Sequence, residues 1–146
     1  MDLKEKHRDI FLFSTAGGSM FPLIRWREYV IVKKVPAEDL QLGDVVVYRG
    51  EGARPVCHRI VSLENRNGRR WFQMRGDQRE EDDGPVPAEA IIGKVIAVRK
   101  KYGLLEPSSP EWSSYSDPRE HRWTRGLFKL KNLIKKVAFF IRPNRT

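Results

Sequence analysis

Three features of this sequence predict a mostly β fold. Runs of β-branched and aromatic residues, typical of strands, occupy much of the first hundred positions. Gly, Pro, Asn and Asp separate these runs, and no long helical periodicity appears before residue 100. The chain has 146 residues, of which 40 % are hydrophobic, enough for one ordinary core. We therefore expect one β domain over residues 1–104, followed by a tail.

Five segments carry the strand pattern. They are residues 29–35, 44–49, 56–63, 70–75 and 91–99. The second segment follows the turn formers Leu42 and Gly43. The Asn67-Gly68 pair separates the third and fourth segments, and this dipeptide is a strong signal for an antiparallel hairpin. Within the last segment, Gly93 predicts a bulge or bend.

The tail differs from the body in composition and charge. Residues 105–118 hold three prolines among serines and are predicted to form a linker. Residues 119–146 hold nine basic residues and one acidic residue, so they carry eight of the nine net positive charges. Apolar residues recur there in steps of three and four over 123–141. This spacing predicts a basic amphipathic C-terminal helix.

The amphipathic segment 123–141 limits the partners and location we expect. Its apolar stripe and lysines fit a helix on an anionic membrane surface, or equally a helix packed on the β body. No nucleic acid partner is expected, because it would leave the stripe unexplained. No run approaches the roughly 20 apolar residues of a membrane span, and residues 10–13 are too short for a secretory signal. We expect a cytoplasmic protein, peripheral at the inner face of the membrane if the helix binds lipid.

The segment around Ser19 is a candidate nucleophile loop. A serine hydroxyl needs an exposed position and a neighbouring base to attack a carbonyl. Gly18 and the glycine before it allow a sharp turn and close approach of a substrate chain. Met20 follows the serine, and Pro22 restricts the turn after it. On its own, the segment is more typical of an ordinary loop than of a nucleophile site.

His58 is the best-placed candidate base. It lies within a predicted strand in an apolar context, whereas the other two histidines lie in charged segments. Its neighbour Cys57 is the only cysteine, so no internal disulfide can form. Adjacent strand residues point to opposite faces of a sheet. This alternation excludes a catalytic pair between the Cys57 thiol and the His58 ring.

Residues 75–84 form the only dense acidic cluster after His58. A catalytic imidazole needs a carboxylate on its far nitrogen to fix the tautomer and stabilise the cation. Asp77, Asp82 and Asp83 are the candidates, and the sequence does not choose between them. The cluster lacks the ligand order of a calcium loop, and no histidine pair supports zinc. We therefore expect no metal and no cofactor.

Taken in order, these motifs resemble those of type I signal peptidases. The sequence reads Ser-Met-x-Pro, Gly-Asp-Val-Val-Val-Tyr, His-Arg-Ile-Val, Arg-Gly-Asp followed by Asp-Asp, and Ile-Gly-Lys-Val. It resembles the Ser-His branch of the endoplasmic reticulum, archaea and spore-forming bacteria, over about residues 13–98. The resemblance implies a coiled antiparallel β domain with a hydrophobic cleft beside the serine. It also implies an endopeptidase that cuts an extended precursor after small residues.

Position by position, the resemblance implies Ser19 as nucleophile, His58 as base, Asp83 as catalytic acid and Asp77 in a supporting role. Gly18, Met20 and Pro22 would then belong to the substrate and oxyanion segment. Two features depart from the family. This sequence shows no N-terminal transmembrane anchor, and Gly17 stands where many members carry a serine that helps to bind the oxyanion. The oxyanion would then depend on backbone N–H groups, notably that of Ser19.

Three alternatives remain open from the sequence. Lys33 and Lys34 follow the serine loop, near the place where lysine-type enzymes carry their base, so a Ser-Lys dyad is a minor possibility. A self-cleaving protein of the LexA kind would use the same fold. A non-catalytic peptide-binding or membrane-adaptor domain would use the fold without its chemistry.

Overall fold

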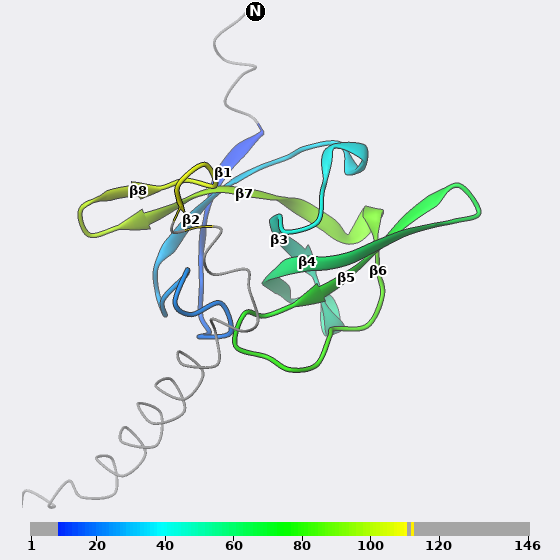
Figure 1. The fold of residues 1–146 in the computed structure, drawn as a ribbon, viewed down its shortest axis with the longest axis horizontal. Helices are drawn as coiled ribbons and strands as arrows, with labels where there is room; N and C mark the ends of the chain where they lie inside the picture. Colours follow the sequence, from blue (N-terminus) through cyan, green and yellow to red (C-terminus); the bar gives the residue numbers. More distant parts are fainter. Residues whose placement is uncertain (1–8, 111, 113–146) are drawn as a thin grey trace, which may run out of the picture.

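The computed structural model describes residues 9–110 and residue 112, which form a curled antiparallel sheet (Figure 1). The strands are β1 (Ile10–Ser14), β2 (Tyr29–Lys33), β3 (Val45–Arg49), β4 (Pro55–Arg66), β5 (Arg69–Arg75), β6 (Val86–Pro87), β7 (Ile91–Lys100) and β8 (Gly103–Leu105). Three short 3-10 helices lie between strands: η1 (Ala37–Asp39), η2 (Glu51–Ala53) and η3 (Ala88–Ala90). The mostly β class predicted from the sequence is confirmed.

Strand β7 joins the two halves of the sheet. The strand order is β1-β2-β7-β3-β4-β5-β6, and β8 also pairs with β7. The first half of β7 pairs with β3, while its second half pairs with β2 and β8. Gly93 lies where these partners meet, and a Cβ there would stand 2.7 Å from a Val32 methyl. The register with β3 shifts beside it, as the glycine predicts.

The five predicted strand segments correspond to β2, β3, β4, β5 and β7. Asn67 and Gly68 form the predicted β4–β5 turn, with φ of 49° and 76°. Positive φ at both central residues is what a tight hairpin turn of this kind requires. Strands β1, β6 and β8 were not predicted from the sequence. The last two are only two and three residues long, too short for an alternating pattern to register.

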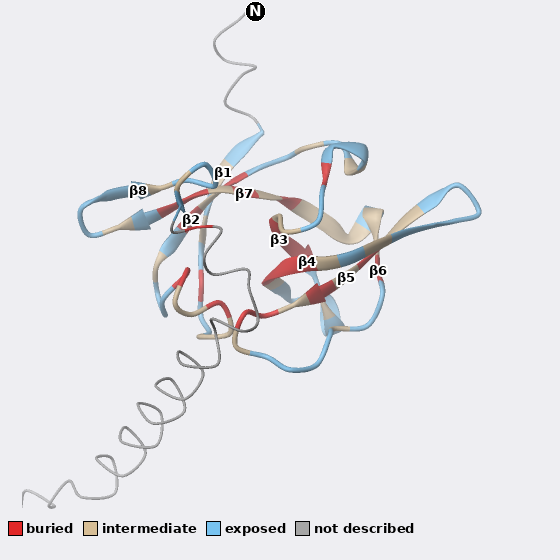
Figure 2. Cartoon of the chain, viewed as in Figure 1, coloured by how far each residue is buried: buried red, intermediate tan, exposed pale blue. Residues whose placement is uncertain are grey.

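Both faces of β3 and of the first half of β4 are buried, each by its own cluster of apolar side chains (Figure 2). The first cluster includes Val45, Val47 and Cys57, and the second includes Val46 and Tyr48. This double burial explains why β3 reads as an unbroken apolar run, because neither face meets water. Residues of β4 are therefore positioned from both sides.

The predicted linker and helix fall mostly beyond the described residues. Of residues 105–118, Leu105 ends β8, and Trp112 is buried in the first core cluster. The predicted helix over 119–146, and with it the membrane contact through 123–141, lies outside the described residues. Within residues 9–110 and 112, no helix is long and apolar enough to cross a membrane.

Candidate active site

Ser19 lies in the loop between β1 and β2, and buried side chains hold that loop in place. Met20, Leu23 and Ile24 are all at most 3 % exposed and belong to the first core cluster. The Ile24 N–H donates to the Met20 carbonyl at 2.9 Å, which closes a turn directly after the serine. At the base of the loop, the Thr15 N–H donates to the Glu28 carbonyl at 3.1 Å. Ser19 itself stays half-buried on a firmly anchored segment.

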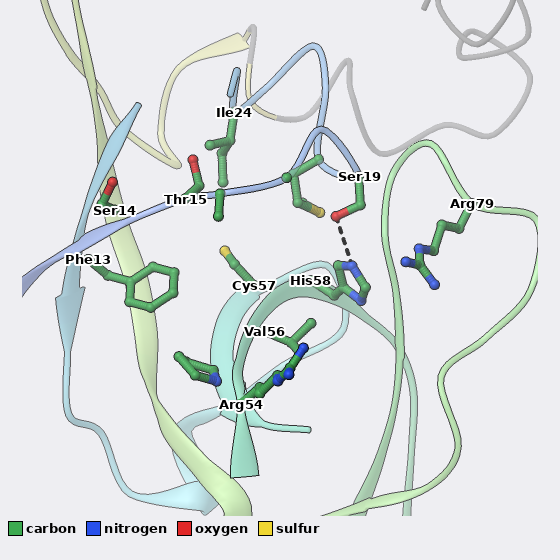
Figure 3. Close-up of a pocket in the computed structure, with 14 residues that line it drawn as sticks. Phe13, Ser14, Thr15, Ser19, Ile24, Arg54, Val56, Cys57, His58 and Arg79 are labelled. Atoms are coloured by element: carbon green, nitrogen blue, oxygen red, sulfur yellow. Dashed lines mark hydrogen bonds between the residues drawn. The ribbon is translucent and has the colours of Figure 1, made fainter. Parts of the chain in front are cut away.

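The His58 ring faces Ser19 from the middle of β4. Its Nε2 lies 2.9 Å from the Ser19 Oγ, the distance of a hydrogen bond (Figure 3). Nε2 is therefore placed to accept the hydroxyl proton. Cys57, one residue earlier, packs into the first core cluster and makes no such contact with the ring. Strand alternation separates the two side chains, as the sequence predicted.

Asp83 lies behind the imidazole. One of its oxygens, Oδ2, contacts the His58 Nδ1, and the Tyr48 hydroxyl donates to the same oxygen at 2.5 Å. The Asp83 N–H donates to the Met74 carbonyl at 2.7 Å, which fixes the end of the acidic loop against β5. Serine, histidine and aspartate therefore form a continuous hydrogen-bonded chain, the arrangement that general-base activation of a serine needs.

The other two candidate acids have different partners. Asp77 receives two hydrogen bonds from the Arg59 guanidinium, at 2.9 and 2.8 Å, and both side chains are buried. Asp82 pairs with Arg75 at 2.5 Å in a more exposed position. The sequence left the choice of acid open, and the structure places Asp83 alone of the three against His58. The ion pair of Asp77 instead anchors the residue next to His58, a supporting position.

The start of the acidic loop packs directly on Ser19 and His58. A Cβ added at Gly76 would lie 2.9 Å from the Ser19 Cβ and 3.0 Å from the His58 Nε2. Real Cβ atoms essentially never show a contact as short as the first, and the second is also unusually tight, so the close approach requires glycine. The Gln78 N–H donates to the Ser19 carbonyl at 2.7 Å. The side-chain amide of Gln78 donates to the Phe21 carbonyl, also at 2.7 Å. This loop thus ties the serine to the histidine.

Burial sets the protonation states of the site. It lowers the pKa of His58 below 6.5, an effect that the hydrogen bond and charge of Asp83 oppose and the charge of Arg79 reinforces. His58 is therefore neutral at pH 7 and able to accept a proton. Burial and the Asp83 hydrogen bond raise the pKa of Tyr48, so its hydroxyl remains a donor. Burial raises the pKa of the Cys57 thiol to about 12, which leaves it protonated and a poor nucleophile.

Two clefts meet at His58. The first, of about 440 Å³, runs between residues 13–17 and residues 54–58 and contains Ser19 (Figure 3). Much of its wall is apolar, and Phe13, Met20 and Ile24 contribute to it. The second, of about 450 Å³, lies on the Asp83 side of the ring. Val56, His58 and Arg79 line both clefts.

The remaining predicted residues fall in different places. Met20 lines the first cleft, whereas Gly18 and Pro22 are not among its lining residues; the Gly18 carbonyl accepts the Phe21 N–H at 3.1 Å. Lys33 and Lys34 are exposed around the end of β2, outside the cleft lining. This placement disfavours the Ser-Lys dyad. In the described part of the chain, no three His, Cys, Asp or Glu side chains gather as a metal site.

Sequence reasoning missed Tyr48, Gly76 and Arg79. Tyr48 stands two residues after Val46, which pairs with His58 across β3 and β4, so strand alternation could have placed it on the histidine's face. Gly76 directly precedes Asp77 in the Arg-Gly-Asp motif, so its lack of a side chain was visible in the sequence. Nothing in the sequence singles out Arg79 within a charged loop.

Comparison with known proteins bears out the resemblance. The chain is 30 % identical over 82 residues to signal peptidase I W of Bacillus subtilis (strain 168). The aligned residues make up 55 % of this chain and 43 % of that protein, so the chain spans less than half of the relative's length. No protein-family model matches the chain. The distant similarity confirms the relation to type I signal peptidases that the motifs predict.

Proposed function

We propose that this protein is a serine endopeptidase that cleaves precursor proteins by acyl transfer. The observation that carries the proposal is the continuous contact from Ser19 Oγ through His58 to Asp83. Three side chains from separate segments meet in the order that activates a serine. The distant similarity to a signal peptidase supports the same reaction class and a precursor-protein substrate.

In the proposed mechanism, the Ser19 Oγ attacks the scissile carbonyl while His58 Nε2 takes its proton. Asp83 accepts the Nδ1–H hydrogen bond, which fixes the tautomer and stabilises the imidazolium. The imidazolium then returns the proton to the leaving amine, and a serine ester remains. Water, activated by His58, hydrolyses this ester and restores the free hydroxyl. Attack by the serine and attack by the water each need a neutral His58 at their start, in agreement with the lowered pKa.

The backbone beside Ser19 suits an extended peptide. Pairing between β4 and β5 begins at Arg59, so the part of β4 before it pairs with β3 alone. Across the cleft, β1 is an edge strand of the sheet. A peptide laid between these two edges could hydrogen-bond as an added strand. The apolar wall formed by Met20, Ile24 and Cys57 favours uncharged side chains next to the scissile bond, among them the small ones that the family resemblance implies.

Stabilisation of the oxyanion is the weakest element of the proposed active site. Gly17 lines the cleft and offers no side-chain donor, so the backbone N–H of Ser19 must supply the stabilisation. Removing one oxyanion donor from a serine peptidase costs about 10²–10³ in kcat. We therefore expect a slow enzyme.

The test is cleavage of a peptide library by the full chain and by Ser19→Ala, with products identified by mass spectrometry. The proposal requires cleavage by the wild type and its loss, by at least about 10³-fold, in the variant. Unchanged cleavage by Ser19→Ala would remove the proposal. Ser14→Ala is a matched control, because this serine lines the same cleft without contacting His58 in any described hydrogen bond.

Incubation of the full chain alone at mildly alkaline pH separates the self-cleaving alternative. Specific fragments from the wild type, absent from Ser19→Ala, would favour self-cleavage over action on another protein. Peptide binding by the wild type without any product would favour the non-catalytic alternative.

A further inference from the structure

The charged side chains that line the first cleft are all basic. They are Arg54 and Arg79, and no carboxylate lines this cleft among the described residues. The excess does not follow from the net charge, because most of that charge lies in residues 119–146. In the second cleft, Glu51 and Asp83 balance the basic residues. Positive charge is therefore a local property of the cleft that holds Ser19.

The two arginines stand at different ends of the first cleft (Figure 3). Arg79 lies beside the His58 ring, and its positive charge adds to the lowering of the ring's pKa by burial. Its backbone N–H donates to the Gly76 carbonyl at 2.8 Å, which ties it to the loop that packs on the serine. Arg54 lies before β4, and Figure 3 shows it on the far side of Val56 from Ser19.

The chemistry of the proposed function orients a peptide between these ends. The proposed function places the small side chain before the scissile bond against the apolar wall near Cys57. The leaving amine must reach His58 Nε2 to receive its proton, so the chain after the bond passes the histidine. Arg79 is the charged side chain that lines both clefts at this point. The first residues after the bond are thus carried toward its guanidinium.

We propose that this protein prefers substrates with a carboxylate side chain immediately after the scissile bond, and that Arg79 recognises it. The inference rests on the proposed function. A guanidinium binds a carboxylate through two parallel hydrogen bonds, which gives geometric selectivity as well as attraction. A concave site strengthens such attraction by focusing the field. Because Arg79 is exposed, we expect a preference of about three- to tenfold rather than an absolute requirement.

The test uses three peptides that differ only at the first position after the bond, which is Glu, Gln or Lys. For the wild type, kcat/KM should fall in that order. Arg79→Gln should lose most of the difference between Glu and Gln, and Arg79→Glu should favour the Lys peptide. Arg54→Gln removes the same charge from the other end of the cleft and should keep the preference for Glu.

A binding measurement makes the outcome independent of catalysis. The affinities of the same peptides for Ser19→Ala and for the double variant Ser19→Ala/Arg79→Gln are compared by fluorescence anisotropy. The inference is supported if the Glu peptide binds more tightly than the other two to Ser19→Ala but not to the double variant, even if no peptide is cleaved. Equal binding and equal cleavage of all three peptides would overturn it. So would a loss of preference in Arg54→Gln as large as in Arg79→Gln.

Discussion

Cys57 and His58 are neighbours in β4, yet they lie on opposite faces of the sheet and differ in reactivity. Cys57 faces an apolar cluster, where burial raises the pKa of its thiol to about 12. His58 faces the other way, where burial lowers the pKa of its ring and three side chains surround its two nitrogens: Ser19, Asp83 and, through the shared oxygen, Tyr48. Burial keeps both groups neutral. Only the group with hydrogen-bonding partners can exchange a proton.

This contrast shows that reactivity depends on the partners of a buried group and not on its intrinsic chemistry. Thiols are better nucleophiles than hydroxyls, yet the thiol here is the inert group. The hydroxyl of Ser19 has a neutral base at 2.9 Å, and the Cys57 thiol has none among the described contacts. Substitutions on the two faces should therefore differ in their effect on activity.

Asp83→Asn should have the largest effect. The amide cannot stabilise the imidazolium, and it favours the wrong tautomer of His58, so we expect kcat to fall about 10³–10⁴-fold. Because both contributions of Asp83 raise the His58 pKa, that pKa should fall further in the variant. Steady-state kinetics and the histidine NMR signals measure the two effects. Asp82→Asn serves as the control, since Asp82 pairs with Arg75. A similar loss in Asp82→Asn would reassign the acid.

Gly76→Ala should have the second-largest effect on kcat. The added methyl group must displace the Ser19 Cβ or the His58 ring by several tenths of an ångström. A displacement of this kind lowers kcat by about 10–10²-fold, and overpacking costs about 1–3 kcal/mol of stability. Kinetics and thermal unfolding report the two losses. Gly84→Ala lies in the same loop and meets no atom within 4 Å, so it should change neither.

The pH dependence of kcat/KM tests the protonation state of His58, and here the expected effect is smaller. Because only neutral His58 can accept the proton and burial lowers its pKa from 6.5, the acid limb of the kcat/KM profile should lie below pH 6.5. Asp83, Arg79 and Asp77 are the charged groups that act on the ring. Tyr48→Phe removes one donor from the Asp83 oxygen that contacts the ring. The hydrogen bond of that oxygen with the protonated ring should then strengthen and move the acid limb toward higher pH. Tyr102→Phe, at a residue 91 % exposed, should leave it in place. A profile that Tyr48→Phe does not move would contradict this role.

Cys57→Ala should have the smallest effect on kcat. We expect a change of less than about threefold, because the thiol has no part in proton transfer, whereas the altered cleft wall should act on KM. About 1 kcal/mol of stability should be lost with the buried sulfur atom. Iodoacetamide should label the native protein slowly at pH 7 and the unfolded protein fast, as followed by mass spectrometry. Rapid labelling of the native thiol would place Cys57 among the reactive groups.

The sequence predicted most of the sheet because its strands are long or bounded by turn residues. It placed Ser19 and His58 in separate elements, and family motifs rather than spacing linked them. It could not choose among Asp77, Asp82 and Asp83, because the chosen acid depends on how the loop after β5 folds back. The Arg59 partner of Asp77 was likewise hidden, since a pair 18 residues apart leaves no local pattern. The tight packing at Gly76 is a property of three-dimensional contact alone.

The loop after β5 also determines when the site can exist during synthesis. Ser19 and His58 leave the ribosome well before Gly76, Gln78 and Asp83, which supply the packing, the backbone hydrogen bond and the acid. A nascent chain that stops before residue 76 holds the nucleophile and the base without the segment that aligns them. The order of the residues along the chain therefore delays assembly of the reactive centre until nearly the whole β body has been made.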